Sequence, residues 1–177
     1  MILLGVDPGL LQMGYGVIEA QGNKVRLREG GIIQGGPSST PLEERLVTLY
    51  DGIREVVVEY SPDALALEEI YAHYAYPNTA VLMGHARGVV CLAAAQNRIP
   101  VFNYASTRVK HAMVGSGRAS KAQVQRAIQA RLNLPQVPEP NDVADALALA
   151  LCHWQVIGVE DKALQSLTVH GSHYVVG

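Results

Sequence analysis

The sequence predicts a mixed α/β fold in which helices flank a five-stranded sheet. Three observations indicate it: short apolar runs that end at turn residues, a hairpin pattern near the N-terminus, and alternating helix-like and strand-like segments after residue 40. The 177 residues, 49% hydrophobic and 17% charged, suit one folded domain rather than a disordered chain or a repeat array. No segment looks like a membrane span or a signal peptide, so we expect a cytoplasmic protein.

The N-terminal segment predicts an antiparallel meander of three strands. Residues 2–7 form an apolar run that ends at a Pro-Gly pair, and residues 14–20 and 25–34 have the pattern of a hairpin. Asp7 is therefore expected at the end of the first strand.

The rest of the chain predicts helices that alternate with two further strands, which right-handed crossovers would make parallel. Residues 158–177 show no clear period, so we expect a domain over residues 1–157 followed by a loose tail. The expected elements are a helix over 41–60, a strand over 64–70, a helix over 77–97, a strand over 101–104, and helices over 106–114, 121–132 and 142–156.

The charge is distributed very unevenly along the chain. Residues 70–138 contain eight Lys or Arg and no Asp or Glu, a formal charge of +8, whereas the remaining residues sum to −10. A basic surface of this kind favours a polyanion such as nucleic acid, although a solvated surface that merely lacks acids would give the same count. Tyr71 lies at the start of this segment and could stack on an unpaired base, or could equally be a half-buried ring with a wet hydroxyl.

Acidic side chains recur at strand ends and at a helix start. Asp7 ends the first strand, Glu68 and Glu69 lie at the tip of the fourth, and Asp142 and Asp145 share one face of the last helix. The two helical aspartates could simply complement the helix dipole. Asp145, however, is surrounded by alanine and leucine, so its carboxylate needs a partner or a metal ion.

The residue types favour a hard metal ion. No His and Cys cluster has the spacing of zinc ligands, and Cys91 and Cys152 lie in apolar contexts that predict buried free thiols. Carboxylate oxygens around one cleft are typical of Mg²⁺ or Mn²⁺ and of two-metal hydrolysis of a phosphodiester, with two ions per active site.

Several motifs, taken in their order and spacing over residues 2–157, resemble bacterial RuvC-type Holliday junction resolvases. The resemblance implies a ribonuclease H-like fold, a homodimer and Mg²⁺-dependent symmetric nicking of four-way DNA junctions. It also implies cooperation with a RuvA–RuvB branch-migration complex. The motifs are Gly5-Val6-Asp7-Pro8-Gly9, Gly14-Tyr15-Gly16, Ala66-Leu67-Glu68, residues 83–88, Arg108-Val109-Lys110 and residues 142–148.

The same resemblance assigns residues. Asp7, Glu68, Asp142 and Asp145 fall on the acidic tetrad of the family, as metal ligands and catalytic groups. Strand alternation puts Glu68 and Glu69 on opposite faces, so only one of them can join Asp7, and the resemblance selects Glu68. Lys121 is predicted as a further catalytic residue near the scissile phosphate, and Arg87 as a DNA-contacting or structural arginine. The predicted DNA-binding residues are Tyr71, Arg87, Lys110, Arg118 and Lys121.

Two other interpretations remain open at this stage. The Asp7-Pro8-Gly9 turn also resembles the phosphate-binding turn of sugar kinases and actin-like ATPases, which need a second large domain. Alternatively, the chain could be a non-catalytic junction-binding module whose acids only cap helices. Nucleotide binding would favour the first, and cleavage that depends on a metal would exclude the second.

Overall fold

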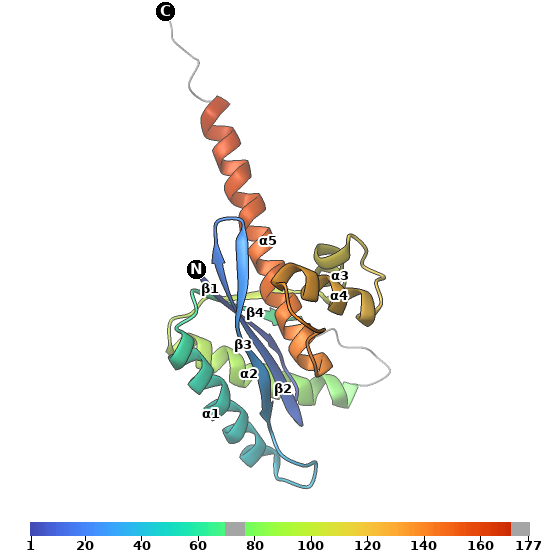
Figure 1. Cartoon of the computed structure of the whole chain (residues 1–177). Coiled ribbons are helices and arrows are strands. Elements are labelled where there is room, and N and C mark those ends of the chain that lie inside the picture. Colours follow the sequence, from blue (N-terminus) through green and yellow to red (C-terminus); the bar gives the residue numbers. More distant parts are fainter. Residues whose placement is uncertain (70–76, 171–177) are drawn as a thin grey trace, which may run out of the picture.

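The computed structural model describes the backbone of residues 1–69 and 77–170, with side chains for residues 1–69 and 80–158. Five strands form one sheet in the order β3-β2-β1-β4-β5 (Figure 1). β2 pairs antiparallel with β1 and β3, and β4 pairs parallel with β1 and β5, which confirms the predicted mixed sheet. The strands are β1 (Ile2–Asp7), β2 (Gln12–Gln21), β3 (Lys24–Gln34), β4 (Ala64–Glu68) and β5 (Val101–Tyr104).

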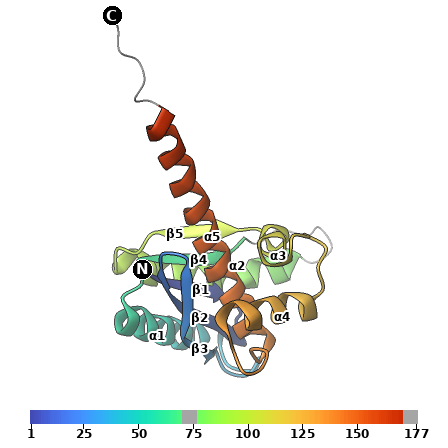
Figure 2. The same ribbon diagram turned by 45° about the horizontal axis from the view of Figure 1, so that its top comes forward.

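Helices cover both faces of the sheet (Figure 2). α1 and α2 pack against each other on one face, and α5 lies across β1 and β2 on the other, with α3 and α4 beside it. The bounds are α1 (Leu42–Tyr60), α2 (Pro77–Gln96), α3 (Ser106–Val114), α4 (Lys121–Leu132) and α5 (Asn141–His170).

Strand alternation divides the core in two. Leu3 points toward α5 and packs in one buried cluster with Leu147, whereas Leu4 and Val6 point to the opposite face and pack in a second cluster with Leu49. The odd-numbered residues of β1 therefore face α5, and Asp7 continues that series at the end of the strand.

Glycines let α5 lie directly on the sheet. A Cβ atom on Gly5 would lie 1.9 Å from the carbonyl oxygen of Ala146, and one on Gly14 would lie 2.1 Å from the carbonyl oxygen of Asp142. No side chain fits at either position, so the backbone of α5 approaches the strands as closely as two main chains allow. This contact fixes the start of α5 next to the end of β1.

The last helix is longer than the sequence indicated. The helix expected over residues 142–156 continues to His170, and its C-terminal part extends away from the sheet (Figure 1). Residues 158–170 are therefore helical, and the proposed boundary at residue 157 falls inside a continuous helix. Among the residues that the structure describes, no helix is long and apolar enough to cross a membrane.

Candidate active site

Two neighbouring strands bring the first two carboxylates together. Asp7 ends β1 and Glu68 ends β4, and the parallel register pairs Val6 with Leu67, one residue earlier in each strand. Asp7 follows Leu3 and Gly5 on the face that α5 covers, and Glu68 follows Ala64 and Ala66 on that same face. Both side chains therefore project beneath the N-terminal turn of α5.

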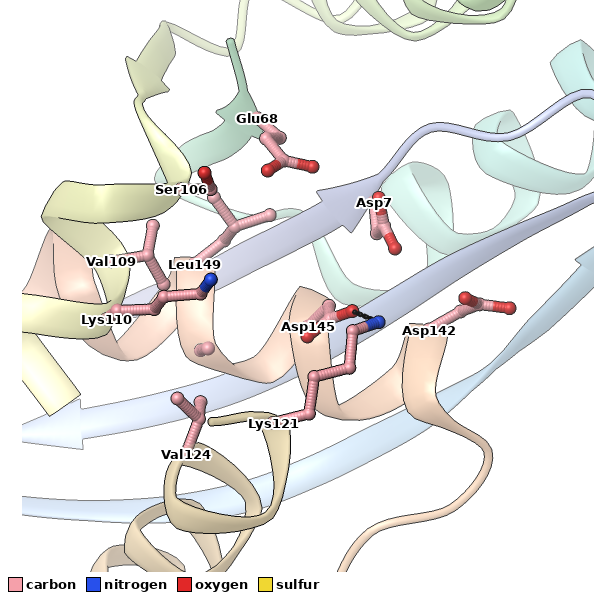
Figure 3. Close-up of a pocket in the computed structure, with 11 residues that line it drawn as sticks. Asp7, Glu68, Ser106, Val109, Lys110, Lys121, Val124, Asp142, Asp145 and Leu149 are labelled. Atoms are coloured by element: carbon pink, nitrogen blue, oxygen red, sulfur yellow. Dashed lines mark hydrogen bonds and ion pairs between the residues drawn. The ribbon is translucent and has the colours of Figure 1, made fainter. Parts of the chain in front are cut away.

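That turn supplies the other two carboxylates. Asp142 and Asp145 lie three residues apart, on the side of α5 that borders the strand ends. Together with Asp7 and Glu68 they line a cavity of about 320 Å³. Figure 3 shows the four carboxylates arranged around this common space. The structure thus brings together the four predicted acids, which are 138 positions apart at the extremes of the sequence.

Two lysines complete the lining of this cavity (Figure 3). Lys121 opens α4 directly after a capping box, in which Ser120 and Gln123 each bond the backbone N–H of the other. Its Nζ donates to Oδ2 of Asp145 at 3.1 Å. Lys110 comes from α3. The partner that Asp145 was expected to need is therefore Lys121, in a pair that is partly open to solvent.

Burial and, after it, mutual repulsion disfavour the charged forms of Asp7 and Glu68. Burial, reinforced by the charges of Glu68, Asp145 and Asp142, raises the pKa of Asp7 to about 7. Burial and the charge of Asp145 also raise the pKa of Glu68, against the opposing effect of Lys121 and Lys110. The site thus gathers more negative charge than its own lysines neutralise.

The site favours the charged form of Lys121, whereas it disfavours the charged forms of Asp7 and Glu68. Its hydrogen bond to Asp145, and then the charge of that carboxylate, raise the pKa of the ammonium group. Lys121 therefore stays positively charged over the whole neutral range, and it can act as a fixed cation or a hydrogen-bond donor, not as a base.

The donor set fits a hard divalent cation. Four carboxylate groups with two raised pKa values present oxygen ligands that lack a compensating charge, which is what Mg²⁺ and Mn²⁺ bind. Within the described side chains, no three Asp, Glu, His or Cys groups lie close enough together to enclose an ion as they stand. The carboxylates would have to move closer together to complete a coordination sphere.

Gln12 is a member of the site that the sequence did not reveal. Its side-chain amide donates a hydrogen bond to Oδ2 of Asp142 and so links the start of β2 to the start of α5. Its position shortly after the Pro-Gly turn was the only available signal, and a glutamine at a strand start is too common to predict a contact 130 residues away.

The two glutamates at the end of β4 differ as predicted. Glu68 lines the cavity and Glu69 does not. The backbone N–H of Glu69 donates to the carbonyl oxygen of Tyr104 at 3.0 Å, which extends the pairing with β5 by one bond. β4 itself ends at Glu68, earlier than the residue 70 expected from the sequence.

Arg87 holds the end of β4 in place. Its guanidinium donates to the carbonyl oxygen of Glu68 and to Oδ1 of Asn103, each at 2.6 Å. This geometry supports the structural interpretation of Arg87, because both bonds are made within the chain. Arg118 is exposed in the loop between α3 and α4, outside the cavity lining. Tyr71 lies outside the described residues.

Both cysteines are free thiols. Cys152 is buried, as predicted, but Cys91 is only half-buried, because its position on α2 lies at the edge of the core. Neither residue lines the carboxylate cavity.

Comparisons with known proteins agree with this geometry. The family model described as crossover junction endodeoxyribonuclease RuvC matches residues 3–153. A protein of that description from Rhodopirellula baltica is 50% identical over 92% of this chain and 91% of its own length. Another from Alkaliphilus oremlandii is 46% identical over 86% of this chain and 92% of its own.

A solved structure extends the likeness to the fold. The structure titled "T. thermophilus RuvC in complex with Holliday junction substrate" superposes with a TM-score of 0.84 at 33% identity, covering 90% of this chain and 96% of that one. The predicted ribonuclease H-like fold of the resolvases is therefore confirmed. The chain belongs to the RuvC family of crossover junction endodeoxyribonucleases.

Proposed function

We propose that this protein acts in the cytoplasm, in homologous recombination and DNA repair, and resolves four-way DNA junctions by hydrolysing two phosphodiester bonds at symmetric positions. The observation that carries the proposal is the meeting of four carboxylates from β1, β4 and α5 with two lysines at one cavity. This lining suits a phosphodiester, since the acids can hold metal ions and the ammonium groups can contact the phosphate.

The acids Asp7, Glu68, Asp142 and Asp145 would hold the metal, with two Mg²⁺ or Mn²⁺ ions per site as the proposed stoichiometry. When bound, such ions lower the pKa of a water and stabilise the charge of a leaving oxygen. In the overall hydrolysis, the water oxygen joins phosphorus, the bond from phosphorus to the 3′ oxygen breaks, and 5′-phosphate and 3′-hydroxyl ends result.

The lysines have distinct proposed roles. Lys121 is a permanent cation next to Asp145, so it can neutralise the scissile phosphate or donate to the leaving 3′ oxygen. Lys110, from the α3 wall of the cavity, would contact the same phosphate from another direction. Arg118, exposed in the loop between α3 and α4, would contact the strand outside the cavity. Stacking of Tyr71 on a base stays a prediction.

A homodimer is the proposed assembly, because two cuts at twofold-related positions need two active sites. The outer face of α2 supports it. Val81 and Leu92 are 60% and 52% exposed there, and ideal Cβ atoms on Gly84 and Gly88 would have nothing within 4 Å. These residues line a shallow apolar groove that a second copy of the helix could fill.

The dimer is tested by the solution mass of variants, measured by light scattering or sedimentation. Leu92→Glu would put a charge in the groove and is expected to give monomers. Val47→Glu, at a 59% exposed site on α1, is the matched control and should leave a dimer. A dimeric Leu92→Glu protein would contradict the assignment of this face.

A RuvA–RuvB complex is the proposed partner that moves the junction. Co-sedimentation of the two on junction DNA tests this proposal.

The decisive experiment uses a labelled synthetic four-way junction and a matched linear duplex, with Mg²⁺ or chelator, read on a denaturing gel. We expect paired nicks in the junction alone, only with the metal, and ends that a ligase can seal. Glu68→Gln should abolish cleavage while low-salt junction binding survives.

Glu69→Gln is the matched control, because it makes the same change one residue away, outside the cavity. It should cut at nearly the unmodified rate. Equal cleavage by Glu68→Gln and the unmodified protein would refute the assignment of the site, and metal-independent cutting would refute the proposed chemistry.

A further inference from the structure

A second cavity adjoins the carboxylate site. It has a volume of about 640 Å³ and shares Asp7 and Asp142 with the first cavity, so a strand bound at the carboxylates can continue directly into it. Its other walls come from the β1–β2 turn, the loop before α1, the first turn of α1 and the N-terminal half of α2. The lining residues beyond the shared pair and Gln12 are Pro8, Gly9, Leu10, Leu11, Ser38, Arg45, Leu82 and Met83.

The walls of this cavity are built tightly. The backbone N–H of Gly35 donates to the carbonyl oxygen of Leu11 at 2.9 Å, and a Cβ atom on Gly35 would lie 2.1 Å from the carbonyl oxygen of Leu10. The loop that carries Ser38 therefore packs directly on the β1–β2 turn, and the two sides of the cavity are fixed to each other.

Arg45 is the unusual residue of this lining. It is only 9% exposed, and its Nε is buried without a hydrogen-bond partner among the described residues. It also makes no ion pair within the part of the chain that the structure describes. By contrast, Arg26 and Arg28, which also lie outside the basic segment 70–138, both form an ion pair with Glu19.

A buried guanidinium nitrogen without a partner costs free energy, and a largely buried arginine usually has a paired anion. The carboxylates of Asp7 and Asp142 border the same cavity but form no ion pair with Arg45. A phosphate group is a suitable partner, since the planar guanidinium donates two parallel hydrogen bonds to it and the hydroxyl of Ser38 can add another.

The remaining wall is apolar and consists of Leu10, Leu11, Leu82 and Met83. Leu11 and Leu82 are 54% and 44% exposed, so part of this apolar surface is open to a ligand. A cation and a hydroxyl beside an apolar wall match a nucleotide, which has a charged phosphate, a sugar and a flat base.

Resting on the proposed function, we propose that this second cavity is a nucleotide subsite, in which Arg45 binds the DNA backbone phosphate next to the scissile one while the apolar wall contacts the attached sugar and base. Arg45 thereby sets the position of the strand at the carboxylates and does not touch the reacting atoms. It is a positioning residue.

The test replaces single phosphates of the junction by neutral methylphosphonates, at the two positions on each side of the cleavage site. Single-turnover cleavage is measured for the unmodified protein and for Arg45→Gln. We expect one methylphosphonate to slow the unmodified protein by about 10- to 100-fold, in line with the loss of a charge-assisted hydrogen bond. Arg45→Gln should be slowed similarly on the normal junction and show no further loss with that methylphosphonate.

Arg54→Gln is the matched control, because Arg54 is an exposed arginine on the same helix. It should keep the sensitivity to the methylphosphonate. If Arg45→Gln fails to fold, Arg45→Lys replaces it, since the lysine keeps the charge but loses the planar fork. Replacing the same phosphate by a methylphosphonate should then slow Arg45→Lys less than it slows the unmodified protein.

Two results would overturn the subsite. One is a scan in which no flanking methylphosphonate slows the unmodified protein, and the other is an equal penalty in the unmodified protein and the Arg45 variant. Neither affects the proposed function, which fails only if the unmodified protein leaves the normal junction uncut.

Discussion

Asp7 links the chemistry of the site to the stability of the fold. Its pKa of about 7 in the folded protein, against 3.8 in an unfolded chain, means that the folded state releases this proton less readily. The group therefore destabilises the fold increasingly as the pH rises from about 4 to 7, and by a constant amount above that. A shift of about three units corresponds to roughly 4 kcal/mol at pH 8.

Asp7→Asn should consequently stabilise the metal-free protein while abolishing cleavage. We expect the free energy of unfolding at pH 8, measured with urea in the presence of chelator, to rise by up to about 4 kcal/mol. At pH 5 the gain should shrink to less than roughly half, because the folded wild-type carboxyl is then protonated. A variant less stable than the wild type at both values would contradict the stated cause of the pKa shift.

Arg87 offers a second prediction at this scale. Arg87→Met removes the bonds to Glu68 and Asn103, so the end of β4 loses its connection to α2. We expect a loss of about 1.5–3 kcal/mol in the free energy of unfolding and a lower cleavage rate at saturating junction. Arg126→Met, at an exposed site on α4, is the control for thermal melting and cleavage. Equal behaviour of the two variants would show that the bonds do not position Glu68.

Among the elements, the contact between α5 and the sheet is the most demanding. Gly14→Ala would put a methyl group 2.1 Å from the carbonyl oxygen of Asp142 and 2.9 Å from its Cβ, so the first turn of α5 must move. We expect a loss of about 1–3 kcal/mol in stability and a marked fall in cleavage. Circular dichroism melting and the junction assay measure both effects.

Gly158→Ala is the matched control on α5. An ideal Cβ there has nothing within 4 Å, and alanine favours a helix more than glycine does. This variant should gain about 0.5–1 kcal/mol and cut normally. If Gly14→Ala melted and cut like Gly158→Ala, the close approach of α5 to β2 would not matter for the site.

The elements themselves were largely predictable from the sequence. β1 and β5 have the predicted bounds, because apolar runs that end at turn residues mark buried strands well. The end of α5 was not predictable. Residues 158–170 show no clear period, and a helix that leaves the sheet is no longer marked by the period that core packing imposes.

The residues of the candidate site likewise include some that the sequence could predict and some that it could not. The four carboxylates could be predicted, because strand ends and the first turn of a helix are places where topology alone puts side chains near one another. Gln12 and Arg45 could not, since their positions depend on how one turn packs against a loop and a helix. Local sequence carries no signal for such contacts.

For the whole molecule, pH and metal binding should act on stability together. The raised pKa values of Asp7 and Glu68 both make the metal-free protein less stable at pH 8 than at pH 5. A cation binds the ionised carboxylates, so Mg²⁺ should raise the melting temperature more at pH 8, where no proton has to be displaced. Calorimetric scans with Mg²⁺ or chelator at both values measure this difference.

Asp7→Asn is the internal control, since its metal-free stability should depend less on pH. A melting temperature that responds to Mg²⁺ equally at pH 5 and pH 8 would show that the raised pKa values and metal binding are not connected. A larger rise of the melting temperature with Mg²⁺ at pH 8 would show that the bound ion offsets the destabilisation by the ionised carboxylates.

The position of Asp142 and Asp145 near the start of α5 also bears on protein synthesis. A chain emerging from the ribosome presents Asp7 and Glu68 early but lacks the other two acids until translation has passed residue 145, and α5 must then dock on β1 and β2. Nascent chains and fragments that stop before this helix therefore carry an incomplete set of carboxylates. The complete candidate site can therefore form only after α5 has been synthesised and has docked on the sheet.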